Sequence, residues 1–197
     1  FGSEPIDELL RGGKRPTVYP KGFDDRRIFQ ISQKPGIVYF VGKSGILYAT
    51  AARNARTRVL EILSQRKRNP LKGLLEGITD IRVKELGSEI LARLCLESEL
   101  SATHYPCNAM PAKKSDIGAP LPDMAVFFPG RFPGDRSVVI VRRGKVLGYT
   151  FVREEESYSL YDILDRLILF HQTENLVPIL RPALEKNGVR VQFIKEK

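Results

Sequence analysis

One acidic side chain in this sequence lies where an apolar one would be expected. Glu97 follows Ile90 by seven residues and Leu94 by three, on a stripe of a predicted helix that is otherwise apolar. An unpaired charge in a protein interior is costly, so a buried carboxylate at this position needs a partner. An ion pair with Arg58 or a divalent metal ion in the same pocket would satisfy it. The two arrangements are compatible, because a vacated metal site often leaves an ion pair.

The charge of the chain indicates a polyanionic partner. The net charge is +9 over 197 residues, and the isoelectric point is about 9.7. One basic cluster comprises Arg53, Arg56, Arg58, Arg66, Lys67, Arg68 and Lys72, and a second comprises Arg131, Arg136, Arg142, Arg143 and Lys145. A solvated basic face is the ordinary explanation for such clusters. Clustering together with an isoelectric point above nine nevertheless favours contact with DNA or RNA.

The remaining composition indicates a soluble, cytoplasmic protein. Hydrophobic residues make up 42% of the chain, and no run of eighteen apolar residues could span a membrane. No secretory signal with a positive start and an apolar centre is present. Cys95 and Cys107 lack the spacing of metal ligands, which favours a reduced compartment. The chain also lacks a P-loop, a dinucleotide-binding glycine pattern and zinc-type spacing.

The pattern of apolar residues predicts an α+β protein whose first part holds a small three-stranded antiparallel sheet flanked by helices. Strands are expected at 36–42 and 45–49, joined by a hairpin, and at 78–86. Helices are expected at about 51–66 and 88–104, with shorter ones at 6–10 and near Pro70. We expect an N-terminal arm over 1–30 and a first domain over 31–108.

A second small α+β domain is expected over 124–197, after a proline-rich linker at 109–123. Its predicted strands are 124–128, 137–142, 145–152 and 189–194, with a tight turn at Arg143-Gly144. Its predicted helices are 158–170 and 174–186, and Asn187-Gly188 is a stop signal for the second of them.

Two segments of the first part resemble the GIY-YIG nuclease superfamily, in its excinuclease C subunit branch. The first is Gly36-Ile37-Val38-Tyr39-Phe40 followed by Gly45-Ile46-Leu47-Tyr48-Ala49-Thr50. The second runs from Gly87 through the predicted helix to Asn108 and is similar to the glutamate helix of that family. The resemblance covers roughly residues 30–108. The second part, at 130–149, is similar to the tail after such a domain in bacterial DNA polymerase III epsilon-type exonuclease proteins.

The resemblance implies roles for individual residues. In the family, a tyrosine of the first strand is thought to deprotonate water, and a second tyrosine and an arginine position the phosphate. Twelve residues separate Gly36 from Tyr48, so Tyr48 takes the place of the second tyrosine and Arg58 that of the arginine. Glu97 takes the place of the metal ligand, for Mg²⁺ or Mn²⁺. Asn108 resembles the asparagine that closes the motif, one residue early.

The sequence also departs from the family pattern. The first tyrosine of the motif falls on Val38, and Thr50 and Ala51 replace a glycine and a lysine. Tyr39 follows Val38, but strand side chains alternate, so Tyr39 should face the other side of the sheet. Only a one-residue bulge would bring it round to serve as the base. The carboxylate and the arginine are therefore retained, whereas the base and a phosphate-binding lysine are missing.

These observations predict a DNA-binding domain of a repair or replication protein with impaired catalysis. A phenol, a guanidinium and a carboxylate, from Tyr48, Arg58 and Glu97, are expected to converge where a phosphate could lie. The residues expected to contact DNA are Arg53, Arg56, Arg66, Lys67, Arg68 and Asn108. Two alternatives remain: an active metal-dependent endonuclease that uses Tyr39 or a metal-bound water as base, and a protein-interaction module for a replication or repair partner.

Overall fold

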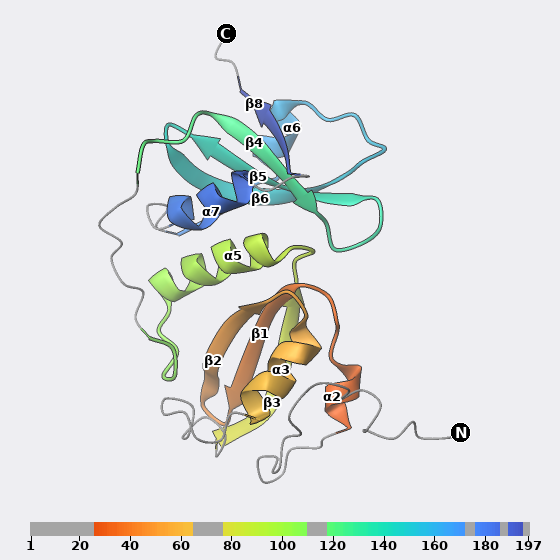
Figure 1. Ribbon diagram of the computed structural model, residues 1–197, viewed down its shortest axis with the longest axis vertical. Helices are drawn as coiled ribbons and strands as arrows, with labels where there is room; N and C mark the ends of the chain where they lie inside the picture. The colour runs from red at the N-terminus through yellow and green to blue at the C-terminus, as the bar shows by residue number, and fades with distance from the viewer. Residues whose placement is uncertain (1–25, 65–76, 110–117, 172–175, 186–188, 195–197) are drawn as a thin grey trace.

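Two antiparallel sheets lie one above the other with a helix between them (Figure 1). The computed structural model describes residues 26–64, 77–109, 118–171, 176–185 and 189–194. The α+β architecture and the three-stranded first sheet are confirmed. The predicted short helices at 6–10 and near Pro70, and the stop signal at Asn187-Gly188, lie outside the described residues. None of the described helices is long and apolar enough to cross a membrane.

The first sheet has the strand order β2-β1-β3. Its strands are β1 (Gly36–Gly42), β2 (Gly45–Ala52) and β3 (Ile78–Glu85), and β1 is antiparallel to both neighbours. The predicted hairpin between the first two strands is confirmed, and Gly45 supplies the positive φ of 128° that its turn needs. Every residue of β1 except Tyr39 is buried, because helices cover both faces of this central strand.

Helices α2 (Arg27–Gln30) and α3 (Ala55–Ser64) cover one face of the first sheet. Val59 and Ile62 of α3 pack there with Val38 and Phe40 of β1. The predicted start of this helix at residue 51 is wrong, because β2 continues to Ala52. The Asn54 side chain then accepts a hydrogen bond of 3.0 Å from the Thr57 N–H and caps the first turn of α3.

Helix α5 (Glu89–Ala102) covers the opposite face of the first sheet. Its start is the one that the sequence predicts, since the Ser88 side chain accepts a hydrogen bond of 3.2 Å from the Leu91 N–H. Its end comes two residues before the predicted 104, because Thr103 already has an extended backbone. Gly87, just before the cap, has a φ of 78° and lies against the Gly130 backbone.

The second sheet has five antiparallel strands in the order β7-β6-β5-β4-β8. Three of them form a meander: β4 (Met124–Pro129), β5 (Asp135–Arg142) and β6 (Lys145–Arg153). The predicted tight turn is confirmed, since Arg143 and Gly144 both have positive φ, at 50° and 72°. The predicted last strand is confirmed as the edge strand β8 (Arg190–Phe193), which pairs with β4.

The predicted helix over 158–170 is wrong in its second half. Helix α6 (Leu160–Asp165) begins with a capping box in which Ser159 and Asp162 bond each other's backbone N–H groups. It ends early, and residues 168–169 form the short strand β7 (Ile168–Leu169) beside β6. Gly148 of β6 permits this pairing, because a Cβ there would lie 2.3 Å from the Ile168 carbonyl oxygen.

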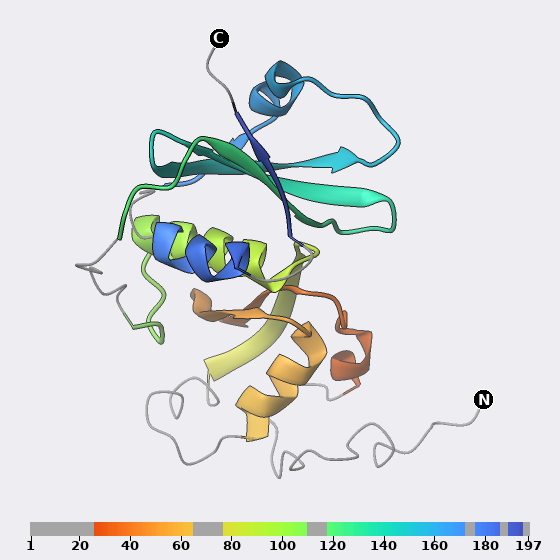
Figure 2. The same ribbon diagram turned by 45° about the horizontal axis from the view of Figure 1, so that its top comes forward.

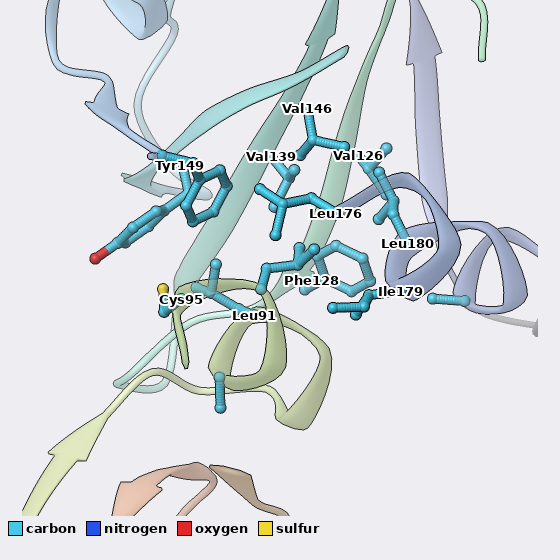
Figure 3. Packing of buried hydrophobic residues seen from close by; sticks show 14 of the residues in the cluster. Leu91, Cys95, Val126, Phe128, Val139, Val146, Tyr149, Leu176, Ile179 and Leu180 are labelled. Carbon is cyan, nitrogen blue, oxygen red and sulfur yellow. The ribbon is translucent and has the colours of Figure 1, made fainter. Parts of the chain in front are cut away.

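Helix α7 (Val177–Leu184) lies beside α5 in the space between the two sheets (Figure 2). Leu91 and Cys95 of α5 face residues of the second sheet and of α7, among them Phe128 and Leu180 (Figure 3). The same core cluster includes Ile37 and Ala49 of the first sheet. One hydrophobic core therefore runs from one sheet to the other through α5, across the expected boundary between domains. The division into two domains stays a prediction.

Candidate functional site

Tyr48 and Arg58 lie on the α3 side of the first sheet. The half-buried Tyr48 ring lies 6.0 Å from the Phe40 ring, centroid to centroid. Thr50 is two residues further along β2 and therefore faces the same side. Its hydroxyl oxygen accepts a hydrogen bond of 3.3 Å from Arg58 Nε. The structure thus brings the predicted arginine to the strand that carries the predicted tyrosine.

Val38, where the resemblance expects the first tyrosine, lies on this same side. Val38 is fully buried in the α3-side cluster, and its registered partner on β2 is Thr50. Tyr39 packs against the core cluster on the other side of the sheet, which confirms the expected alternation. The irregularity in the β1–β2 pairing falls between Phe40 and Val41, after Tyr39, so no bulge turns its ring toward Tyr48.

The hydroxyl of Tyr39 is hydrogen-bonded to Glu99, a residue that the sequence analysis did not single out. It donates a hydrogen bond to the Glu99 carboxylate, whose oxygens lie 2.7 and 2.9 Å away, and Lys84 Nζ lies 3.1 Å from the same carboxylate. Burial raises the pKa of Tyr39 far above its usual value, and the hydrogen bond to Glu99 raises it further. Tyr39 therefore stays protonated at neutral pH. A partly buried phenol usually bonds to a polar partner, and this is the signal from which such a partner could be predicted.

Glu97 belongs to a different layer from Tyr48 and Arg58. It lies half-buried on α5, on the opposite face of the sheet from α3. The predicted ion pair between Glu97 and Arg58 is wrong: Arg58 Nη1 lies 3.1 Å from the Glu61 carboxylate of its own helix. Within the described ranges, no hydrogen bond or ion pair joins Glu97 to Tyr48 or Arg58. The expected convergence of these three side chains is not present in the contacts of the site.

The metal ion expected at Glu97 has no cluster of typical ligands among the described residues. In the part of the chain that the structure describes, no three His, Cys, Asp or Glu side chains gather in an arrangement that could hold one. Mg²⁺ can also be held by one carboxylate when substrate phosphates complete its shell. The side chains expected to position a phosphate are, however, on the other side of the sheet. A metal ion at Glu97 therefore stays a prediction.

Arg58 instead lines an open pocket of about 630 Å³ where β2 ends and α3 begins. Its polar lining comes from Gln33, Arg53, Asn54, Thr57, Arg58, Glu61 and Glu89. The α5 carboxylate in this pocket is thus Glu89, from the first turn of the helix, rather than Glu97. Two arginines and two glutamates balance in charge, so a bound anion would have to compete with the carboxylates for the guanidinium groups.

The basic residues expected to contact DNA have different surroundings. Arg53 is exposed at the rim of the pocket. Arg56 is committed to the fold, since its guanidinium donates hydrogen bonds of 3.0 Å to the Ile31 carbonyl and 2.7 Å to the Phe29 carbonyl. It ties α3 to the segment that carries α2. The other three basic candidates, Arg66, Lys67 and Arg68, lie outside the described residues.

Asn108 closes the outer edge of β2. Its side-chain Oδ1 accepts a hydrogen bond of 2.8 Å from the Ala49 N–H, and its Nδ2 donates one of 2.9 Å to the Ala49 carbonyl. The Cys107 N–H also donates to the Leu47 carbonyl, at 2.8 Å. Because β2 is an edge strand, these bonds continue its ladder with the segment after α5. The Asn108 amide is therefore used in holding the sheet.

Comparison with known proteins does not assign a function to these residues. No protein-family model matches the chain, and no curated protein matches it. The interpretation therefore depends on the residues themselves. Tyr48 and Arg58 lie on one side of the first sheet, and Tyr39 bonds Glu99 on the other.

Proposed function

We propose that this chain binds DNA through a nuclease-like fold whose hydrolytic site is impaired. The observation that carries the proposal is the fully buried Val38, at the position where the resemblance to GIY-YIG nucleases requires a tyrosine. Hydrolysis of a phosphodiester needs a group that takes a proton from water, within hydrogen-bond reach of that water. A valine side chain has no such group.

Tyr39 does not replace the missing base. Its ring is on the α5 side of the sheet, and its hydroxyl proton is held by Glu99. A tyrosine acts as a base through its phenolate, and the raised pKa of Tyr39 disfavours that form at neutral pH. The two candidates for the base on β1 are thus an apolar side chain and a protonated phenol.

DNA contact is supported by the charge of the chain and by the two arginines that line the pocket between β2 and α3. The net charge of +9 favours a polyanionic ligand. Arg53 and Arg58 present guanidinium groups, which match the geometry of phosphate oxygens. Contacts of this kind are made to the nucleic-acid backbone, so binding depends on salt and only weakly on sequence.

Fluorescence anisotropy with a labelled duplex tests this proposal. Arg53→Ala should weaken binding and lower the slope of log K against log salt by about 0.9, the value for one lost phosphate contact. Lys43→Ala is the matched control, because Lys43 is equally exposed but lies in the turn at the other end of β2. A chain that binds no duplex at low salt, or equal losses in both variants, would contradict the proposal.

The second candidate function is an active metal-dependent endonuclease, which the retained Tyr48 and Arg58 favour. Incubation of the chain with duplex, flap and single-stranded DNA in Mg²⁺ or Mn²⁺ separates the two. We expect binding without cleavage. Cleavage that disappears in Glu97→Gln, with its fold intact by circular dichroism, would establish the enzyme instead.

A further inference from the structure

An exposed phenylalanine with two cations nearby marks the loop that joins β4 and β5. Phe132 has 56% of its surface accessible. Lys34 Nζ lies 5.0 Å from its ring centroid, and the guanidinium carbon of Arg131 lies 5.8 Å from it. Both distances are within the range of cation–π attraction. Lys34 precedes the first sheet and Arg131 precedes β5 of the second, so both parts of the molecule contribute to this site.

The loop that presents Phe132 is held in place on both sides. The Gly130 N–H donates a hydrogen bond of 3.0 Å to the Asp135 carbonyl, and the Asp135 N–H donates one of 3.1 Å to the Phe132 carbonyl. Lys34 Nζ donates one of 3.2 Å to the Arg131 carbonyl and also pairs with Glu85. The exposed ring is therefore mounted on a fixed support, which lowers the entropy lost when a ligand binds to it.

A broad pocket opens beside the ring. Its volume is about 730 Å³, within the usual range of ligand sites. Arg131 lies over the Phe151 ring, with its guanidinium carbon 4.1 Å from the centroid. The charged side chains of its lining are Arg131, Arg153, Arg166, Asp135, Glu155 and Glu156. The three acids balance the three arginines, so this pocket does not attract a ligand by net charge.

We propose that Phe132 is a stacking platform for an unpaired base of a nucleic acid. Flipped or single-stranded bases stack on aromatic rings and on the planes of arginine guanidinium groups, and this site offers both. Duplex DNA keeps its bases stacked on one another, so it cannot use the platform. Lys34 of this site follows Gln33 of the pocket between β2 and α3, but Phe132 and Arg131 lie in the second part of the chain, and the site does not depend on the nuclease resemblance.

Binding of labelled oligothymidylate of about 15 nucleotides tests the platform, since single-strand sites cover about 4 to 16 nucleotides. Phe132→Ala should weaken binding by about 5- to 150-fold, the effect of losing one stacked base. Phe132→Trp should retain the affinity, because tryptophan also offers a flat ring. Phe193→Ala is the matched control: Phe193 is 65% exposed, but it lies on β8.

The salt concentration and the type of nucleic acid provide two further measurements. Because stacking rather than charge carries the contact, the ratio between wild type and Phe132→Ala should persist from about 50 to 200 mM salt, while both affinities fall. Oligouridylate in place of oligothymidylate shows whether RNA or DNA is preferred. Duplex affinity should be unchanged in Phe132→Ala.

Three results would overturn the platform. They are a wild-type chain that binds neither oligonucleotide, a Phe132→Ala variant that binds as wild type does, and an equal loss in Phe193→Ala. The proposed duplex function fails separately: a chain that ignores duplex DNA but loses oligothymidylate binding in Phe132→Ala would keep the platform and lose the duplex contact.

Discussion

The bonds between Asn108 and Ala49 give a stability prediction that can be worked through from the structure. Asn108→Ala removes both bonds, at 2.8 and 2.9 Å. Ala49 is only 1% exposed, so its freed N–H and C=O groups remain largely out of reach of water. A buried polar group left unpaired costs about 1–3 kcal/mol. Since an edge strand can admit some water, we expect the free energy of unfolding to fall by about 2–4 kcal/mol, the lower part of the summed range.

Urea denaturation followed by circular dichroism measures this loss. With an m-value of about 2 kcal/mol/M, the midpoint should fall by about 1–2 M. Asn108→Asp should also lower the stability at pH 7, because its carboxylate still accepts from the Ala49 N–H but cannot donate to the Ala49 carbonyl. A change below about 0.5 kcal/mol, the usual effect of a surface substitution, would refute the reasoning. Full stability combined with lost DNA binding would show instead that the amide contacts DNA.

Three further predictions concern the core around α5. Tyr39→Phe should lower the free energy of unfolding by about 1.5–3 kcal/mol, the value of a hydrogen bond to a charged group, and leave duplex affinity unchanged. Burial raises the pKa of Cys95 from 9.0 to about 12, so the stability it contributes is complete below pH 9 and is lost as pH rises toward 12. Cys95→Ala should flatten this part of a plot of unfolding free energy against pH. Gly87→Ala should lower the melting temperature more than Gly134→Ala does: their φ angles are 78° and 81°, but only at Gly87 would a Cβ lie 2.2 Å from a carbonyl oxygen.

The first sheet could be predicted well because two of its strands are short apolar runs separated by turn residues and the third, β3, alternates between apolar and polar residues. The error at 158–170 has a tertiary cause. Leu160, Leu164 and Ile168 have helical spacing, and nothing local distinguishes them from a helix that continues. Close backbone approach at Gly148 makes strand pairing with β6 available there. Tertiary pairing therefore overrode a local pattern.

Of the candidate site, strand alternation could predict only the face of the sheet on which each strand residue lies. That rule placed Val38 and Tyr39 on opposite faces, as the structure has them. The alternation rule could not predict which glutamate of α5 contacts a residue of the sheet. Glu97 and Glu99 are two positions apart, about 200° around the helix, and only the packing of α5 decides that Glu99 faces Tyr39.

Helix α5 packs against both sheets, so one hydrophobic core joins the two parts of the molecule. A fragment that begins after the proline-rich segment would lack α5, so that only α7 would cover this face of the second sheet and apolar residues such as Val126 and Phe128 would be partly exposed. Such a fragment would aggregate, and the intact chain would melt in one calorimetric transition. The helix also holds the two sheets at a fixed separation. A polynucleotide that contacts both ends of the molecule would therefore bind to two surfaces at a constant distance from each other.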